Sequence, residues 1–96
     1  MDRDEVIDRL RRSDAELRRL GVKTLRLFGS VARGEATDKS DVDLLVAFDG
    51  PATFSGFMAL KIFIEDLLRV RVDLVTENGL RDGVRPRVER DAIRIA

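Results

Sequence analysis

Hydrophobic residues recur along this chain at two spacings, one that predicts helices and one that predicts strands. Residues 3–20 and 54–68 each carry an apolar stripe on one face of a predicted helix, and a third helix is expected from about Pro86. Gly21 follows the first helix and suits the left-handed conformation in which many helices end. The apolar positions of the two terminal helices are Val6, Leu10, Leu17 and Leu20 in the first, and Val88, Ala92 and Ile95 in the last.

Three shorter segments favour strands because they are rich in β-branched and other apolar residues. They cover residues 22–28, 41–48 and 71–75. The second is apolar enough to be a central strand, and turn-forming residues at 49–51 end it. After the first strand, Gly29 breaks the pattern, and residues 30–33 favour a short helical turn with Ser30 near its N-cap. A polar loop over residues 35–40 leads into the second strand.

This order of elements predicts an α/β (α+β) fold, in which helices pack mainly on one face of a small mixed sheet of three or more strands. The pattern leaves the order of the strands open. With 96 residues and neither repeats nor linkers, the chain is expected to form one domain, 1–96.

Composition narrows the chemistry that such a domain can perform. The sequence has no Cys and no His, which excludes disulfides, thiolate nucleophiles and the usual zinc ligands. It lacks Tyr and Trp, so an aromatic platform for single-stranded nucleic acid is not expected. Because Lys+Arg and Asp+Glu are both 18, no net charge attracts nucleic acid or anionic lipid. The remaining Asp, Glu, Ser, Arg, Lys and backbone groups favour hard cations with oxygen ligands.

No membrane or secretory segment is predicted. The N-terminus is charged, and no stretch approaches the roughly 18 apolar residues of a membrane helix. We therefore expect a cytoplasmic protein.

Asp41 and Asp43 are the first candidates for a functional site. Alternate residues of a strand point to the same side, so their carboxylates are expected to lie close together. Two like charges at that spacing repel each other, and a divalent cation such as Mg²⁺ relieves the repulsion. Two such ions can activate an attacking hydroxyl and stabilise a leaving group in nucleotidyl transfer. The alternative is a pair of hydrated carboxylates at the start of a strand.

Two further features extend this candidate site. Gly29 and Ser30 offer backbone N–H groups and a hydroxyl to a phosphate, although a plain turn has the same pattern, and Arg33 has the equally plain reading of a surface residue. Asp73 lies in an apolar strand, where a charge is unexpected without a partner. If that strand lies beside residues 41–48, Asp73 can join the cation site and accept the proton of an incoming hydroxyl. Otherwise it is a charge that protects an edge strand from aggregation.

Together these residues resemble the signature of the DNA polymerase beta-type nucleotidyltransferase superfamily. That signature combines a Gly-Ser turn, an Asp-x-Asp pair and a later third Asp, and the length and the Ala-Arg-Gly at 32–34 resemble the minimal nucleotidyltransferase (MNT) proteins. The resemblance implies a nucleotidyltransferase fold. It implies metal ligands at Asp41, Asp43 and Asp73, with Asp73 also acting as the base, and nucleotide binding by Gly29, Ser30 and Arg33.

The resemblance also implies a function. MNT proteins are similar to antitoxins of type VII-like pairs, in which AMP from ATP is transferred with Mg²⁺ to a Tyr hydroxyl of a HEPN-domain RNase toxin. We therefore expect a protein adenylyltransferase that uses ATP and two Mg²⁺ ions and forms a hetero-oligomer with its toxin. Two alternatives stay open: an antitoxin that neutralises its toxin by binding alone, and a nucleotidyltransferase for a small molecule such as an antibiotic. The second alternative usually requires a further acceptor-binding domain.

Two surfaces are candidates for binding a partner. The C-terminal arginines suit phosphate or an acidic surface, or form a hydrated helix face; they are Arg85, Arg87, Arg90 and Arg94. Phe54, Phe57 and Met58 suit either a partner surface or the core side of their helix.

Overall fold

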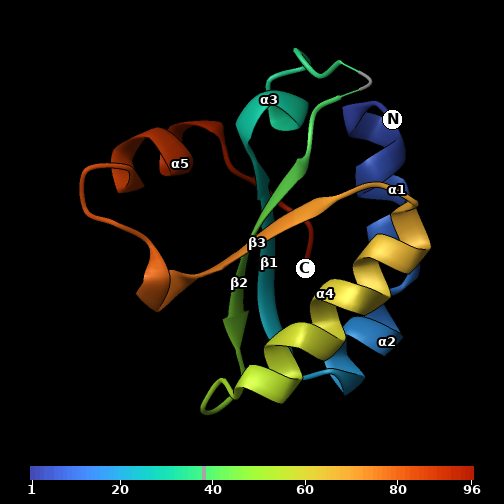
Figure 1. The fold of residues 1–96 in the computed structure, drawn as a ribbon, viewed down its shortest axis with the longest axis vertical. Coiled ribbons are helices and arrows are strands. Elements are labelled where there is room, and N and C mark those ends of the chain that lie inside the picture. Colours follow the sequence, from blue (N-terminus) through green and yellow to red (C-terminus); the bar gives the residue numbers. More distant parts are fainter. Residues whose placement is uncertain (38) are drawn as a thin grey trace.

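The computed structural model describes residues 1–37 and 39–96, so that only position 38 of the predicted polar loop lies outside the described residues. Figure 1 shows its elements along the chain. In order they are α1 (Arg3–Arg12), α2 (Asp14–Arg19), β1 (Val22–Phe28), α3 (Gly29–Ala32), β2 (Val42–Phe48), α4 (Phe54–Leu68), β3 (Val72–Thr76), the 3₁₀ turn η1 (Glu77–Gly79), α5 (Arg85–Asp91) and β4 (Ile93–Arg94). None of the helices in this part of the chain has the length and apolar character needed to span a bilayer.

The strands form one sheet in the order β3-β2-β1-β4. β1 pairs with β2 and with β4 in antiparallel fashion, whereas β2 and β3 are parallel. A parallel pair needs a long crossover connection, and α4 provides it between β2 and β3. The predicted mixed sheet, with the second strand at its centre, is therefore confirmed.

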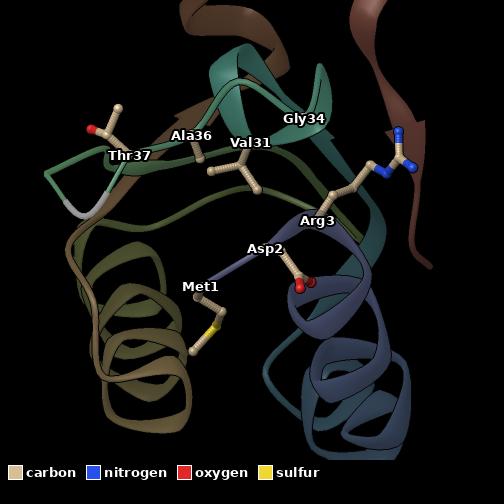
Figure 2. Close-up of a pocket in the computed structure, with 7 residues that line it drawn as sticks. All are labelled: Met1, Asp2, Arg3, Val31, Gly34, Ala36 and Thr37. Atoms are coloured by element: carbon tan, nitrogen blue, oxygen red, sulfur yellow. The ribbon is translucent and has the colours of Figure 1, made fainter.

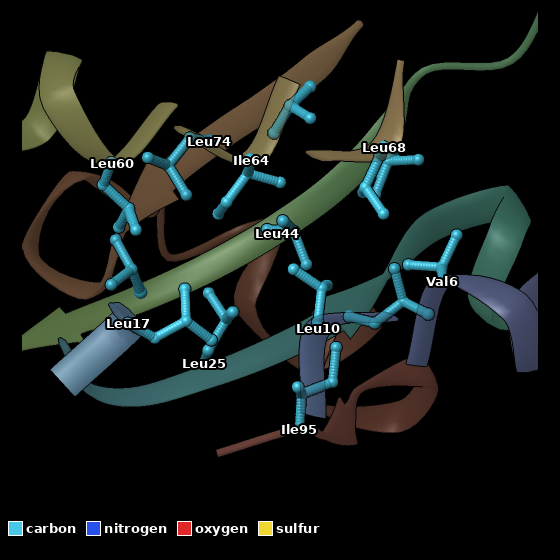
Figure 3. Close-up of a cluster of buried hydrophobic side chains, with 14 of the residues drawn as sticks. Val6, Leu10, Leu17, Leu25, Leu44, Leu60, Ile64, Leu68, Leu74 and Ile95 are labelled. Atoms are coloured by element: carbon cyan, nitrogen blue, oxygen red, sulfur yellow. The ribbon is translucent and has the colours of Figure 1, made fainter. Parts of the chain in front are cut away.

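The main core lies between the sheet and three helices. Figure 1 shows α1, α2 and α4 gathered on one side of the strands, with α5 on the other. Within β2, Val42, Leu44 and Val46 belong to this core, and Figure 3 shows Leu44 among side chains from α1, α4 and β3. Because successive residues of a strand point to opposite faces, Asp43 and Leu45 point away from this core. The helices thus lie mainly on one face, as predicted, and the other face of the sheet carries Asp43.

The predicted helix over residues 3–20 is wrong in one respect, since it breaks at Ser13 into α1 and α2. Position 13 falls on the same stripe as Leu10 and Leu17, both of which are fully buried. Ser has no apolar group to bury at this core-facing position and a lower preference for helix interiors than Leu or Ala, so the helix ends and starts again at this residue. Gly21 follows α2 with a φ of 91°, as predicted.

The predicted C-terminal helix is also too long, because it ends at Asp91. Ile93 and Arg94 form β4 and pair with Leu27 and Arg26 of β1. Ile95 is buried in the core, but as part of this edge segment rather than of a helix. The pairing satisfies backbone groups of β1 that would otherwise form an open sheet edge. The Ile-Arg-Ile alternation of residues 93–95 was the signal for a strand, and helical periodicity concealed it.

The apolar stripe of α4 has two roles. Leu60, Ile64 and Leu68 are fully buried, and Phe57 packs against the same core. Phe54, in contrast, is 80% exposed at the first turn of the helix. Core packing therefore accounts for Phe57 but not for Phe54.

Candidate active site

The parallel pairing of β2 and β3 brings two of the three predicted carboxylates together. Asp43 and Asp73 are direct partners in the strand register, so their side chains lie next to each other on the same face of the sheet. Asp41 precedes β2, which begins at Val42 and not at residue 41 as predicted. The reason is that pairing with the β3 side starts where the Val42 N–H donates to the Arg71 carbonyl. Asp41 is exposed there and lines a different cavity from Asp43.

Asp43 is held in an environment that disfavours its charge. Burial, the charges of Asp73 and Asp41, and a hydrogen bond with Asp73 raise the pKa of Asp43 to about 6, against a smaller opposing effect of Arg33. Carboxylate oxygens are the ligands that Mg²⁺ prefers, and a dication would remove this repulsion, so the residues fit such an ion. Among the residues that the structure describes, no group of three acidic or other metal-binding side chains is arranged so that it could hold a metal ion. The exposed Asp41 side chain is the one that would have to rotate.

The raised pKa of Asp43 leads to a prediction about stability without metal. Between about pH 4 and pH 6 the folded protein binds more protons than the unfolded chain, so the free energy of unfolding falls as the pH rises through this window. Asp43→Asn removes the charge and keeps the side-chain shape. In metal-free buffer we expect the variant to have a higher Tm than the wild type at pH 7.5, by about 5 °C, and a smaller advantage at pH 4.5.

Thermal unfolding followed by circular dichroism at the two pH values measures this effect. Asp66→Asn, at an exposed position of α4, is the control and should not change the pH dependence. An Asp43→Asn variant whose Tm tracks the wild type at both pH values would contradict the strained environment of Asp43.

Gly29 permits a close approach that no other residue allows. Its φ is 77°, in the left-handed region, and a Cβ at this position would lie 2.1 Å from Oδ2 of Asp43. The carboxylate therefore packs directly against the backbone of the turn between β1 and α3. Glycine is needed here both for the conformation and for the space.

Ser30 does not cap α3, which corrects the prediction from the sequence. Phe28 is the N-cap because it stays extended at the end of β1, and the helix begins immediately afterwards at Gly29. Ser30 is therefore inside the first turn, and it lines the same cavity as Asp43. Ser30 is therefore a lining residue of this cavity and not a structural cap, and its role in binding an anion stays a prediction.

Arg33 links two elements at the edge of this cavity. Its Nη1 lies 2.8 Å from Oδ2 of Asp91 on α5, and its Nε lies 3.1 Å from Oε2 of Glu35. The hydrogen bonds with Asp91 and then Glu35 raise the pKa of Arg33, so it stays charged. Arg33 therefore connects the end of α3 to α5, and its expected role in nucleotide binding stays a prediction.

The cavity beside Asp43 has a volume of about 330 Å³ and two walls. The sheet and the Gly29 turn form one wall, and α5 forms the other. The residues that line it are Phe28, Gly29, Ser30, Arg33 and Asp43 on the first wall, and Val84, Arg87, Val88 and Asp91 on the second. The wall formed by α5 was not predicted, although the helical spacing of residues 84, 87, 88 and 91 was a signal for a shared face.

A second cavity, of about 200 Å³, lies between the N-terminus and the loop after α3, and Figure 2 shows its lining residues. They include Arg3, Val31 and Thr37 but none of the predicted site residues. Four of the predicted site residues line the cavity beside β2 and α5 instead: Gly29, Ser30, Arg33 and Asp43.

Comparisons with known proteins show the family to which the chain belongs. The family model of the nucleotidyltransferase domain matches residues 7–95. The protein adenylyltransferase MntA of Thermococcus cleftensis is 40% identical over 91 residues, which cover 94% of this chain and 92% of that protein. A solved structure of a minimal nucleotidyltransferase is 45% identical, with a TM-score of 0.84 over 97% of this chain and 95% of that one.

A more distant structure shares the fold. It is the MNT antitoxin complex with the tri-AMPylated HEPN toxin of Shewanella oneidensis, which matches at 17% identity with a TM-score of 0.68, covering 94% of this chain and 71% of that chain. At this identity the likeness concerns the fold alone. The family match over nearly the whole chain, together with the close relatives of similar length, establishes that this chain belongs to the nucleotidyltransferase family.

Proposed function

We propose that this nucleotidyltransferase is a protein adenylyltransferase that transfers AMP from ATP to a Tyr hydroxyl of a HEPN-domain RNase toxin, and so acts as its antitoxin. The observation that carries the proposal is the Asp43–Asp73 carboxylate pair packed against the Gly29 turn. The adenylyltransferase relative, 40% identical over nearly the same length, supports the choice of AMP and of a protein acceptor.

Three carboxylates hold Mg²⁺ in this proposal: Asp41, Asp43 and Asp73. When bound, two such ions supply positive charge for the phosphates and lower the pKa of an attacking hydroxyl. The strain on Asp43 supports this role because the repulsion raising its pKa is relieved by a cation. Asp41 is exposed immediately before the start of β2, where its side chain can turn toward Asp43.

The nucleotide phosphates bind at the Gly29–Ser30 turn. Backbone N–H groups at the start of α3 and the Ser30 hydroxyl are donors suited to phosphate oxygens, and both residues line the cavity that Asp43 shares. The absence of a side chain at Gly29 leaves room for the Asp43 carboxylate against the turn, so that a cation ligand and the phosphate donors lie next to each other.

The reaction is then a displacement at the α-phosphorus. The oxygen of the acceptor hydroxyl forms a bond to this phosphorus, and the bond from the phosphorus to the bridging oxygen breaks, so that pyrophosphate leaves with the electron pair. Asp73 accepts the proton of the hydroxyl, a role that suits its exposed carboxylate on β3 next to Asp43. Positioning and charge neutralisation supply the catalysis, which suits a chain with neither His nor Cys.

In this proposal residues 1–96 form one minimal domain, and this domain forms a hetero-oligomer with the toxin. The two proteins act in the cytoplasm, where ATP is available. The exposed Asp73 and Asp41 leave one end of the sheet accessible to a protein acceptor. Antitoxin action by binding alone is the second candidate, supported by the exposed Phe54 as a contact surface.

Incubation with a HEPN-domain toxin from the same genome tests the proposed function. With Mg²⁺ and ATP labelled at the α-phosphate, we expect label on the toxin and a mass increase by whole AMP units, and no label from ATP labelled at the γ-phosphate. EDTA and a toxin with the acceptor Tyr replaced by Phe should each abolish labelling. Toxin that loses its RNase activity in the complex without acquiring label would show that binding alone neutralises it.

A further inference from the structure

We propose that Arg87 of α5 binds the β- and γ-phosphates of the nucleotide and is the cation that neutralises the leaving pyrophosphate. This inference rests on the proposed function, because it assigns a residue to the donor nucleotide of the same cavity. This assignment differs from the prediction from the sequence, in which Arg33 is the arginine that binds the nucleotide.

Arg33 has little charge to offer a ligand. Its guanidinium contacts the carboxylates of Asp91 at 2.8 Å and Glu35 at 3.1 Å, so its positive charge is already compensated. The Asp91 side chain is only 15% exposed, which makes this ion pair harder to displace than a fully hydrated one. A phosphate at Arg33 would have to break these contacts before gaining its own.

Arg87 lies in the same cavity without such a partner. Val88, which is 2% exposed, fixes α5 against the rest of the protein, and Arg87 is its direct neighbour on the cavity side. None of the ion pairs found within residues 1–37 and 39–96 involves Arg87. Arg87 therefore lines the same cavity as the Gly29–Ser30 turn, and no ion pair among the described residues compensates its charge.

The other C-terminal arginines have different places. Arg85 donates to the Glu77 carbonyl at 3.2 Å, and Arg94 donates to the Ala96 carbonyl at 3.2 Å. Arg90 is exposed on α5 but does not line the cavity. Of the four arginines singled out in the sequence, the geometry thus selects Arg87 for the phosphates.

The chemistry of AMP transfer explains why an arginine is useful here. The bridging oxygen gains negative charge as its bond to the α-phosphorus breaks, and a guanidinium can bind two phosphate oxygens at once. Arg87 should therefore strengthen the binding of ATP and stabilise the departing pyrophosphate. It should not affect the binding of AMP, which has no β- or γ-phosphate.

Nucleotide affinity of Arg87→Gln tests the inference, with Arg90→Gln as the matched control on the same helix. By isothermal titration with Mg²⁺, we expect Arg87→Gln to bind ATP about tenfold more weakly than the wild type and AMP equally well. Arg90→Gln should match the wild type for both nucleotides. Because both side chains are exposed, both variants should keep the wild-type Tm.

Three outcomes overturn the assignment: ATP affinity within twofold of the wild type in Arg87→Gln, an equal loss of ATP and AMP, or an equal loss in Arg90→Gln. The binding measurement stands apart from the proposed function. A wild-type protein that binds ATP but modifies no toxin contradicts the acceptor and leaves Arg87 to be judged by affinity. A wild-type protein that binds no ATP contradicts both.

Discussion

Replacing Asp43 with Asn should reduce AMP transfer at least about a thousandfold while the protein stays folded. Asp43 is the residue where the Gly29 turn and the partner strand meet, since it packs against Gly29 and pairs with Asp73. Asn keeps the shape but removes one of the negative charges that hold the cations, and charge neutralisation is the main source of catalysis in nucleotidyl transfer.

Initial rates with labelled ATP and the toxin measure the effect of Asp43→Asn, and its Tm in metal-free buffer verifies folding. Asp66→Asn makes the same chemical change at an exposed position of α4 and should retain the wild-type rate. Mg²⁺ should raise the Tm of the wild type at pH 7.5 and have a much smaller effect on Asp43→Asn. A folded Asp43→Asn variant with more than a tenth of the wild-type rate would contradict the assignment.

Gly29→Ala is expected to reduce the transfer rate about a hundredfold and to lower the Tm. The added Cβ would lie 2.1 Å from Oδ2 of Asp43, so the carboxylate has to move. A misplacement of about 1 Å in an active site can reduce the reaction rate about a hundredfold. The positive φ of 77° adds a backbone cost of about 1–2 kcal/mol for any residue with a Cβ.

The chain provides a control that separates these two causes. Gly34 has nearly the same φ, 74°, but a Cβ there would find no atom within 4 Å. Gly34→Ala should therefore lower the Tm by a similar backbone strain and leave most of the transfer rate intact. If both variants lost activity equally, backbone strain and not the contact with Asp43 would account for the effect of Gly29→Ala.

The predicted elements that matched the structure are those with an uninterrupted local pattern. α4 covers the same residues as its apolar stripe, and β1 and the central β2 agree with their predicted segments to within one residue. The predicted helix boundaries were wrong where the local hydrophobic pattern was weak or where the chain pairs with a distant strand. Ser13 interrupts the first helix, and residues 93–94 pair with the edge of β1 instead of extending a helix.

The candidate site divides in a similar way. Residue type and spacing in the sequence single out five candidates: Asp41, Asp43, Asp73, Gly29 and Ser30. The predicted alternation of Asp41 and Asp43 along one strand was wrong, because β2 begins at Val42 and Asp41 lines a different cavity from Asp43. The part of α5 in the cavity wall was missed because it lies more than 50 residues from the Gly29 turn in the sequence.

The sequence by itself determined which residues are candidates for the chemistry, that Asp43 and Asp73 lie on strands, and that no His or Cys takes part. Only the tertiary structure decided that Asp73 is the register partner of Asp43, that Arg33 is bound by Asp91, and that Arg87 lines the cavity. The physical reason is that local periodicity encodes which face of an element is buried. The register between distant strands depends instead on the α4 crossover and on packing in the core. The docking of α5 depends on its packing against the sheet and on the ion pair between Arg33 and Asp91.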